Sequence, residues 1–214
     1  MSALQIGLLA AFLAALFAVV KRTDFNGLTQ QSRIQHIIFG TTAALFSLWL
    51  FRTGIYEGLN VHFLWVTAAV LTLGFRWSFI ACSLALCAVS LLGLEDWRAI
   101  GAQGLFGVLL PIVLTYAIFT LSFHRLPRNV FVYIFVFAFF AGFVSITAKM
   151  GLLGVYYYFE LGYDWHIITD NYLILIPLLV FPEGLLNGMT MTLLIIYKPS
   201  WVYTFHDKFY IDGK

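Results

Sequence analysis

Long apolar segments dominate this sequence, and several of them are long enough to cross a lipid bilayer. A helix of about 20 apolar residues spans the hydrocarbon core, and helices satisfy their own backbone hydrogen bonds there. Of the 214 residues, 62% are hydrophobic and 10% are charged, too little charge to cover the surface of a water-soluble domain. We therefore predict an all-α integral membrane protein that sits in the lipid bilayer and crosses it several times.

Seven apolar segments predict a polytopic bundle of about seven transmembrane helices, which we expect to form one domain over residues 1–214. The predicted spans are residues 3–20, 36–51, 61–75, 78–94, 100–123, 130–148 and 172–197. A polar connector covers residues 23–35, and a segment rich in tyrosine, residues 150–170, precedes the last span.

The basic residues predict the orientation of the bundle, because short loops rich in lysine and arginine stay in the cytoplasm. With the N-terminus outside and the C-terminus in the cytoplasm, nine of the twelve basic residues lie inside, and only Arg52, Arg98 and Lys149 lie outside. Lys21 and Arg22 follow the first apolar segment, which favours a retained span over a cleaved signal peptide. The formal net charge of +2, spread along the chain, excludes nucleic acid as an expected partner.

His62 is the first candidate metal ligand. It lies one residue inside the third apolar segment, whose 15 residues extend only ~22 Å as a helix, and Glu57 and Asn60 precede it. In the predicted orientation this imidazole opens onto an outer face with six acidic residues against three inside, a surface that attracts cations. Imidazole is a common ligand of divalent transition metals. The alternative is an interfacial histidine that hydrogen-bonds to the backbone.

An outer loop carries further candidate ligands. His166 and Asp164, with Asp170 nearby, could join His62 at a metal ion from the tyrosine-rich segment before the last span. The alternative is that these side chains form a solvated loop surface, which needs no ligand to explain it.

The last apolar segment contains the sequence VFPEGLLNGMTMT, which places polar groups at membrane depth. Glu183 lies near the middle of the segment, and Asn187 follows one helical turn later on the same face. Gly184 and Gly188 form a GxxxG pattern that is typical of close helix packing. A carboxylate at this depth either bonds a neighbouring helix and fixes the bundle, or takes part in the passage of a metal or a proton.

Two other features indicate helix contacts or polar groups inside the bundle. Ala10 and Ala14 belong to a small-residue repeat in the first span, on which another helix can approach closely. Gln103 lies near the start of the fifth span, inside an otherwise apolar segment.

These segments together resemble the CbiM/NikM-type substrate-capture membrane subunits of energy-coupling-factor transporters for cobalt and nickel. The likeness covers roughly residues 35–201 and rests on GLNVHFLWVTAAVLTLG, on GAQG at residues 101–104, and on FPEGLLNGMTMTLLIIYKPSW. It implies a seven-span bundle that binds a divalent transition metal, nickel or cobalt, at its outer face with His62 as a membrane-embedded ligand. It also implies residence in the bacterial inner membrane with a transmembrane coupling subunit and ATPase subunits.

The sequence departs from this family at two positions. The family begins Met-His, and its second-residue imidazole completes the metal site with the amino terminus, whereas this chain has Ser2. Gln103 stands where the family has asparagine.

Three function classes remain open from the sequence. The first, which we favour, is a non-enzymatic transport subunit powered by separate ATPase subunits, since the chain has no Walker motif. The second is an assembly protein that handles a metal or cofactor without transport. The third is an intramembrane haem or metal enzyme, although haem needs two histidines at matching depth, and His36 and His124 are predicted near the inner face, far from His62.

Overall fold

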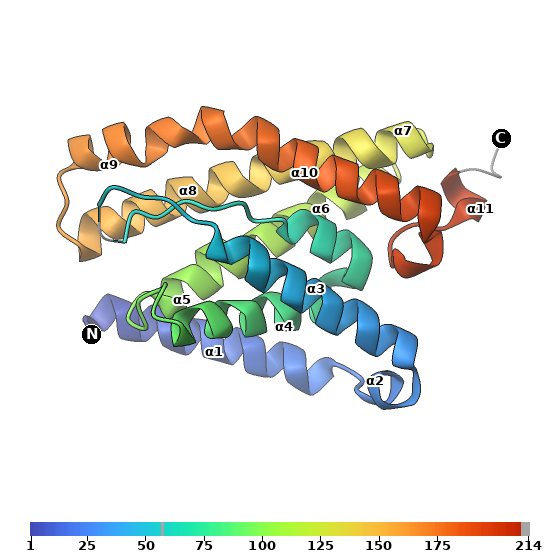
Figure 1. The fold of residues 1–214 in the computed structure, drawn as a ribbon, viewed down its shortest axis with the longest axis horizontal. Helices are drawn as coiled ribbons and strands as arrows, with labels where there is room; N and C mark the ends of the chain where they lie inside the picture. Colours follow the sequence, from blue (N-terminus) through green and yellow to red (C-terminus); the bar gives the residue numbers. More distant parts are fainter. Residues whose placement is uncertain (57, 211–214) are drawn as a thin grey trace.

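The computed structural model describes residues 1–56 and 58–210 as a helical bundle (Figure 1). Glu57 lies outside the described residues. The main helices are α1 (Ala3–Arg22), α3 (Ser32–Leu50), α4 (Val66–Leu91), α6 (Leu110–Phe123), α8 (Ala141–Glu160) and α10 (Ile176–Tyr197). Shorter elements are α2 (Asn26–Gln30), α5 (Ile100–Ala102), α7 (Val130–Val132), α9 (Trp165–Asn171), α11 (Asp207–Tyr210), the π-helical segments η1 (Gln103–Leu109) and η2 (Tyr133–Phe140), and two 3-10 turns, η3 (Leu173–Leu175) and η4 (Pro199–Trp201).

Within the described residues, five helical stretches are long and apolar enough to cross a membrane, which agrees with the predicted membrane protein. They are Ala3–Arg22, Val66–Leu91, Ile100–Phe123, Val130–Glu160 and Trp165–Tyr197. The count of seven spans and the orientation of the termini stay predictions.

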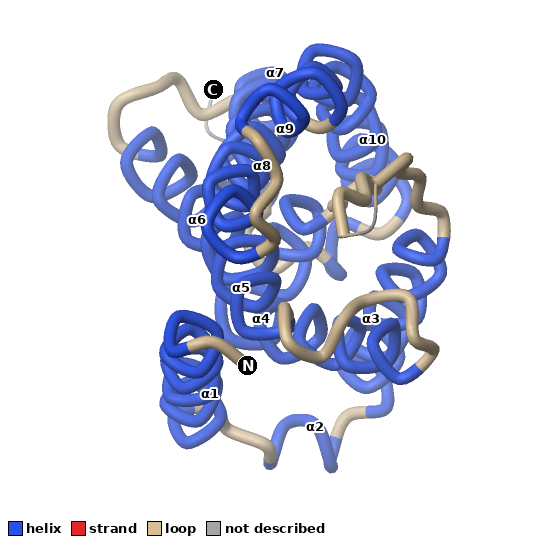
Figure 2. Tube along the Cα trace, turned by 90° about the vertical axis from the view of Figure 1, so that its left-hand side faces the viewer, coloured by secondary structure: helices blue, strands red, loops and turns tan. Residues whose placement is uncertain are grey.

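The helices form a bundle in which α4 is the most enclosed. It packs against α3 and α6, while α8 packs against α6 and α10. In Figure 2 the bundle is seen from its N-terminal end, and α1 lies at one edge beside α4 and α5. Only 6% of the apolar window of α1 is buried, against 67% for α4, so most of α1 is left to face lipid.

The third predicted span, residues 61–75, is not a helix over its full length. Residues 51–56 and 58–65 form a loop, drawn as the thin cyan tube that passes in front of α8 in Figure 1, and the helix begins at Val66. Inside α4 the backbone breaks at Gly74, which has a φ of +74°, a conformation that favours glycine. Residues 66–73 are therefore a short helix that turns at Gly74 into a second, longer helix (Figure 1). The fourth segment correspondingly ends at Leu91 rather than at residue 94.

The sixth predicted span is also longer than expected. Helical structure runs from Val130 through η2 and α8 to Glu160, so the predicted break near residue 149 is absent. The sequence predicts Lys149 outside the membrane, but it lies inside the bundle with 3% of its surface exposed. The sequence there contains no proline, and the lysine finds a hydrogen-bond partner in the interior, so nothing ends the helix.

A proline accounts for the π-helical stretch η1 in the fifth predicted span. Pro111 has no backbone N–H, and just before it the Leu110 N–H bonds the carbonyl of Leu105, five residues back. This π-helical stretch, η1, carries Gln103 and Gly107 into the interior.

Glu183 and Asn187 on α10 hold the N-terminal end of the short helix that begins at Val66. The Glu183 carboxylate accepts hydrogen bonds from the Leu64 N–H and the Trp65 N–H, each at 2.8 Å. Asn187 donates to the same carboxylate at 2.7 Å, and its side-chain oxygen accepts from the Ala68 N–H at 2.8 Å. The first N–H groups of a helix have no partner within it, and an anion there is favoured by the helix dipole. Of the two interpretations of Glu183, its contacts are those of a residue that fixes the bundle.

The other end of the same short helix is capped by the C-terminal segment. Tyr203 and Thr204 donate their backbone N–H groups to the carbonyls of Thr72 and Leu71, at 3.0 and 3.2 Å. The Thr204 hydroxyl also donates to Leu71 at 2.8 Å. Both ends of residues 66–73 are therefore held by α10 and the chain that follows it.

Small residues allow two close helix contacts. A Cβ at Gly101 would lie 2.4 Å from the Leu9 backbone nitrogen, and one at Gly184 would lie 2.2 Å from the Phe143 ring. Gly188 is buried on the same face of α10, without such a tight contact. Ala10 and Ala14 lie on the exposed side of α1, where no other described helix covers them.

We expect Gly101→Ala to destabilise the protein by about 1–3 kcal/mol, because the added methyl group would force α1 away from α5. A fall in the thermal unfolding midpoint in detergent would report this loss. Gly151→Ala is the matched control, because a Cβ there meets nothing within 4 Å and helical alanine is favoured over glycine. Equal midpoints for the two variants would contradict the close contact.

We expect Glu183→Gln to cost about 1–3 kcal/mol, because the amide nitrogen cannot accept and one buried N–H, of Leu64 or Trp65, loses its partner. The same substitution at Glu160, which bonds the exposed Ser2 hydroxyl, should change stability by less than about 0.5 kcal/mol. Thermal unfolding of both variants measures the difference, and an unchanged midpoint for Glu183→Gln would refute the capping role.

Candidate metal site

The loop at residues 51–65 places His62 inside the bundle. Thr53 and Val61 exchange two backbone hydrogen bonds, at 3.0 and 2.8 Å, which close the loop. The Trp49 indole donates to the Leu64 carbonyl at 3.0 Å, and Glu183 holds the Leu64 N–H. His62 therefore stands on a backbone that is fixed on both sides, rather than on the helix that the sequence predicted.

The ring of His62 is held through both of its nitrogens. The Nδ1 atom lies 2.9 Å from the Phe63 carbonyl, which can only accept, and Nε2 lies 2.8 Å from Lys149 Nζ, whose ammonium group can only donate. These partners require Nδ1 to carry the proton and leave the Nε2 lone pair facing Lys149. Burial, with the nearby charge of Lys149, lowers the pKa of His62 well below its usual value, so the ring is neutral.

The tautomer of His62 is one that metal-binding histidines commonly use. Metal-binding histidines commonly donate their second ring N–H to a backbone carbonyl, which fixes the tautomer and the ring plane. His62 makes this contact with Phe63. Its remaining nitrogen faces a cation, although that cation belongs to the protein itself.

Charged and polar side chains surround the pair. Arg52 bonds Glu95 at 2.7 Å, with both side chains about 90% buried. Gln103 donates to the other oxygen of Glu95 at 2.8 Å and to the Tyr157 hydroxyl at 3.1 Å. Together with His62 and Lys149 these groups line an enclosed space of only about 10 Å³, about enough for one water molecule.

A larger cavity lies next to this enclosed space. It has a volume of about 550 Å³ and is lined by side chains that include Asn60, Asp96 and Tyr163. Glu95 lines both the larger cavity and the space around His62, so its carboxylate connects the two.

The structure does not bring the predicted loop ligands to His62. His166 forms an ion pair with Asp170 at 2.8 Å on exposed α9, and Asp164 precedes that helix. Among the described residues, no group of three or more histidine, cysteine, aspartate or glutamate side chains lies close enough to share a metal ion. A metal role for His62, His166 and Asp164 stays a prediction.

Ser2 does not reach the site either. Its hydroxyl caps α1 by accepting from the Gln5 N–H at 3.0 Å, and it donates to Glu160 at 2.7 Å. These bonds hold the start of α1 against the end of α8.

The sequence analysis missed Lys149, Arg52 and Glu95 as parts of this cluster. Lys149 had a detectable signal, since it is the single basic residue in the apolar sequence from residue 130 to 159, and charged residues within such segments are usually functional. Arg52 and Glu95 had no such signal, because each stands in a connector far from the other in sequence.

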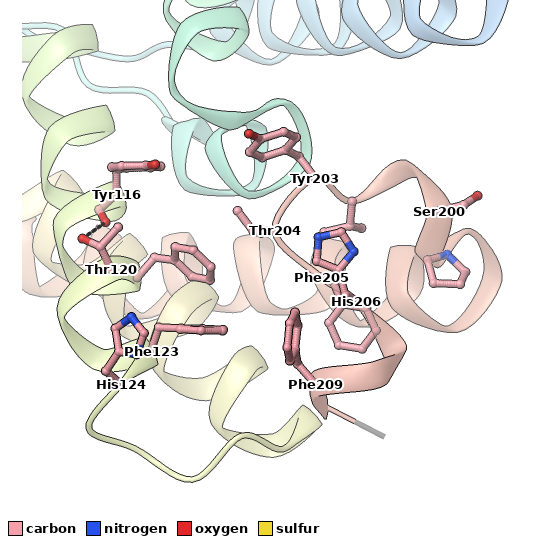
Figure 3. A pocket seen from close by; sticks show the side chains of 13 residues that line it. Tyr116, Thr120, Phe123, His124, Ser200, Tyr203, Thr204, Phe205, His206 and Phe209 are labelled. Atoms are coloured by element: carbon pink, nitrogen blue, oxygen red, sulfur yellow. Dashed lines mark hydrogen bonds between the residues drawn. The ribbon is translucent and has the colours of Figure 1, made fainter. Parts of the chain in front are cut away.

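A second cavity, of about 510 Å³, opens at the opposite end of the bundle (Figure 3). Its walls are α6 and the C-terminal segment, which contribute His124 and His206 respectively. Aromatic rings, including Phe123 and Phe209, fill much of its lining.

Comparisons with known proteins agree with this architecture. The family described as the cobalt uptake substrate-specific transmembrane region, CbiM, matches residues 2–201. A solved structure of a truncated transition metal transporter has a TM-score of 0.72, with 20% identity over 90% of this chain and 94% of that chain. Another transition metal transporter structure has a TM-score of 0.69, with 19% identity over 89% of this chain and 87% of that one. A search of curated proteins gave no match.

At these identities the two structures establish a shared fold, while the family profile covers nearly the whole chain. The resemblance seen in the sequence is therefore confirmed, and the chain belongs to the cobalt uptake substrate-specific transmembrane family, CbiM.

Proposed function

We propose that this chain is the substrate-capture subunit of an uptake system for a divalent transition metal, cobalt or nickel, in the bacterial inner membrane. It binds the ion from the outer face and passes it inward. Separate ATPase subunits and a transmembrane coupling subunit supply the energy, because the chain has no Walker motif. Family membership supports the metal as cargo rather than as a resident cofactor.

The observation that carries the proposal is the state of His62. It is a partly buried, neutral imidazole whose Nδ1 is fixed on the Phe63 carbonyl and whose Nε2 lone pair already faces a positive charge. Imidazole nitrogen favours cobalt and nickel over magnesium and calcium, which prefer oxygen ligands. The adjoining cavity has Glu95, Asp96 and Arg98 in its lining, and the excess of one negative charge favours the approach of hydrated cations to this nitrogen.

The further ligands come from outside the cluster or from a rearrangement of it. A single imidazole does not hold a transition metal tightly, and Glu95 is the nearest described carboxylate in the same enclosed space. Water from the outer cavity supplies the remaining positions in this proposal, which makes the site weak and reversible, as a capture site requires.

We expect His62→Ala to abolish accumulation of radioactive cobalt by intact cells that carry the complete uptake system, because the metal loses its imidazole ligand. His206→Ala is the matched control, since His206 is exposed at the other end of the bundle. His166→Ala shows whether the outer loop contributes a ligand, and a lowered uptake would include it in the site. Unchanged uptake by His62→Ala at equal protein level would refute the proposed site.

The orientation gives a separate prediction. The basic residues favour the C-terminal end in the cytoplasm, and moving Lys149 into the bundle leaves nine against two, Arg52 and Arg98. In a background without Cys82 and Cys87, we expect Asp96→Cys to react with a membrane-impermeant maleimide on intact cells. Lys208→Cys should react only after the cells are opened.

Both positions are exposed at opposite ends of the bundle, so each serves as the control for the other. The reverse labelling pattern would place His62 on the cytoplasmic side and overturn uptake from the outside.

A further inference from the structure

Lys149 has an unusual environment for a lysine. It stands within an apolar helical stretch of 31 residues, and 3% of its surface is exposed. Buried lysines are rare and usually pair with a carboxylate. Here the ammonium group donates instead to the neutral ring of His62 at 2.8 Å. The carboxylate in the same space, Glu95, is bonded to Arg52 and Gln103.

The position of Lys149 excludes a metal ion from His62. An imidazole nitrogen binds a transition metal at about 2.0–2.1 Å along its lone pair. The Nζ atom lies at 2.8 Å in the hydrogen bond to that same lone pair. An ion in the binding position would therefore lie only ~0.7 Å from Nζ. An ammonium group has no lone pair with which to join the metal, so the two cations cannot occupy the site together.

The surroundings hold the lysine in this place. The lysine side chain packs beside Gly107, where an added Cβ would lie at ordinary contact distance, 3.6 Å, from Lys149 Cε. The enclosed space measures about 10 Å³, about one water molecule, so a hydrated ion does not fit beside the ammonium group.

Charge gives a second reason for exclusion. Among the described side chains that line this space, Arg52 and Lys149 are positive and Glu95 is negative, a net charge of +1. A divalent ion would raise this to +3 in a buried region, where repulsion is weakly screened. Withdrawal of Lys149 before the ion enters lowers the net charge of this space to zero. It also frees the imidazole nitrogen of His62.

We propose that Lys149 is a tethered competitor for the metal-binding nitrogen of His62 and sets the affinity and selectivity of the site. This rests on the proposed function, in which His62 is a metal ligand. An incoming ion must bind imidazole strongly enough to displace the ammonium group. Cobalt and nickel meet this condition, whereas magnesium and calcium gain little from an imidazole ligand. The same side chain can return to His62 and favour release of the ion.

The test is titration of the purified, detergent-solubilised full-length protein with cobalt chloride and nickel chloride by isothermal calorimetry. We expect Lys149→Met and Lys149→Gln to bind cobalt at least about tenfold more tightly than wild type, because the competitor is gone. Lys149→Arg keeps the positive charge and should bind no more tightly than wild type. His62→Ala combined with Lys149→Met should lose the gain, because the freed nitrogen is absent.

Gel filtration and the thermal midpoint establish that each variant is folded. Lys149→Gln keeps a hydrogen-bonding group toward His62, so it provides the comparison if Lys149→Met does not fold. Affinities for Lys149→Met and Lys149→Gln equal to or weaker than wild type would overturn the competitor while leaving His62 as a ligand. A gain in cobalt affinity that persists in the double variant would also overturn the competitor, because the gain would not depend on His62. Absence of binding in wild type and in both neutral variants would refute the proposed function as well.

Discussion

The fold depends on one buried carboxylate, that of Glu183. The short helix at residues 66–73 begins inside the bundle, where its first N–H groups have neither water nor an earlier helical turn to bond. Asn187 supplies an acceptor for the Ala68 N–H in the first turn, and Glu183 supplies acceptors for the Leu64 and Trp65 N–H groups just before it. Without these acceptors from α10, the backbone groups would lose their partners in the interior. The end of the loop that carries His62 is therefore fixed by α10.

In the interior, the residues that fix the backbone differ from the residues whose side chains face His62. The carboxylate oxygens of Glu183 accept hydrogen bonds from the Leu64 and Trp65 N–H groups and from the Asn187 side chain. Glu183 therefore acts on the site through the backbone, by fixing the residues next to His62. The side chains that face His62 come from three places: Lys149 from α8, Glu95 from the connector after α4, and Arg52 from the start of the loop that also carries His62. Three parts of the chain that are distant in sequence thus meet around one imidazole.

Much of the fold could be predicted from local sequence, because hydrophobic length and helix-packing signals are local properties. The apolar segments predicted a helical membrane protein, and VFPEGLLNGMTMT indicated a polar, tightly packed face on α10. The start of the short helix at Val66 could not be predicted, because its cap lies about 120 residues later at Glu183. The sequence predicts a span that ends at residue 148, with Lys149 outside the membrane. Its burial depends on His62, 87 residues earlier, and no local pattern contains that contact.

A capture site that contains its own cation meets two opposing requirements. A transporter must bind its ion at low concentration outside and still release it inside. A rigid, fully formed ligand set would satisfy only the first requirement. Here the imidazole is fixed by Phe63, so its orientation costs nothing when the ion arrives. The ammonium group of Lys149 occupies the same nitrogen on a flexible four-carbon stem, so the unloaded protein avoids a buried acceptor without a partner. Binding then exchanges one cation for another, and the net free energy is a difference between two attractions to His62. An exchange of this kind keeps the affinity moderate while preserving the preference for ions that bind nitrogen.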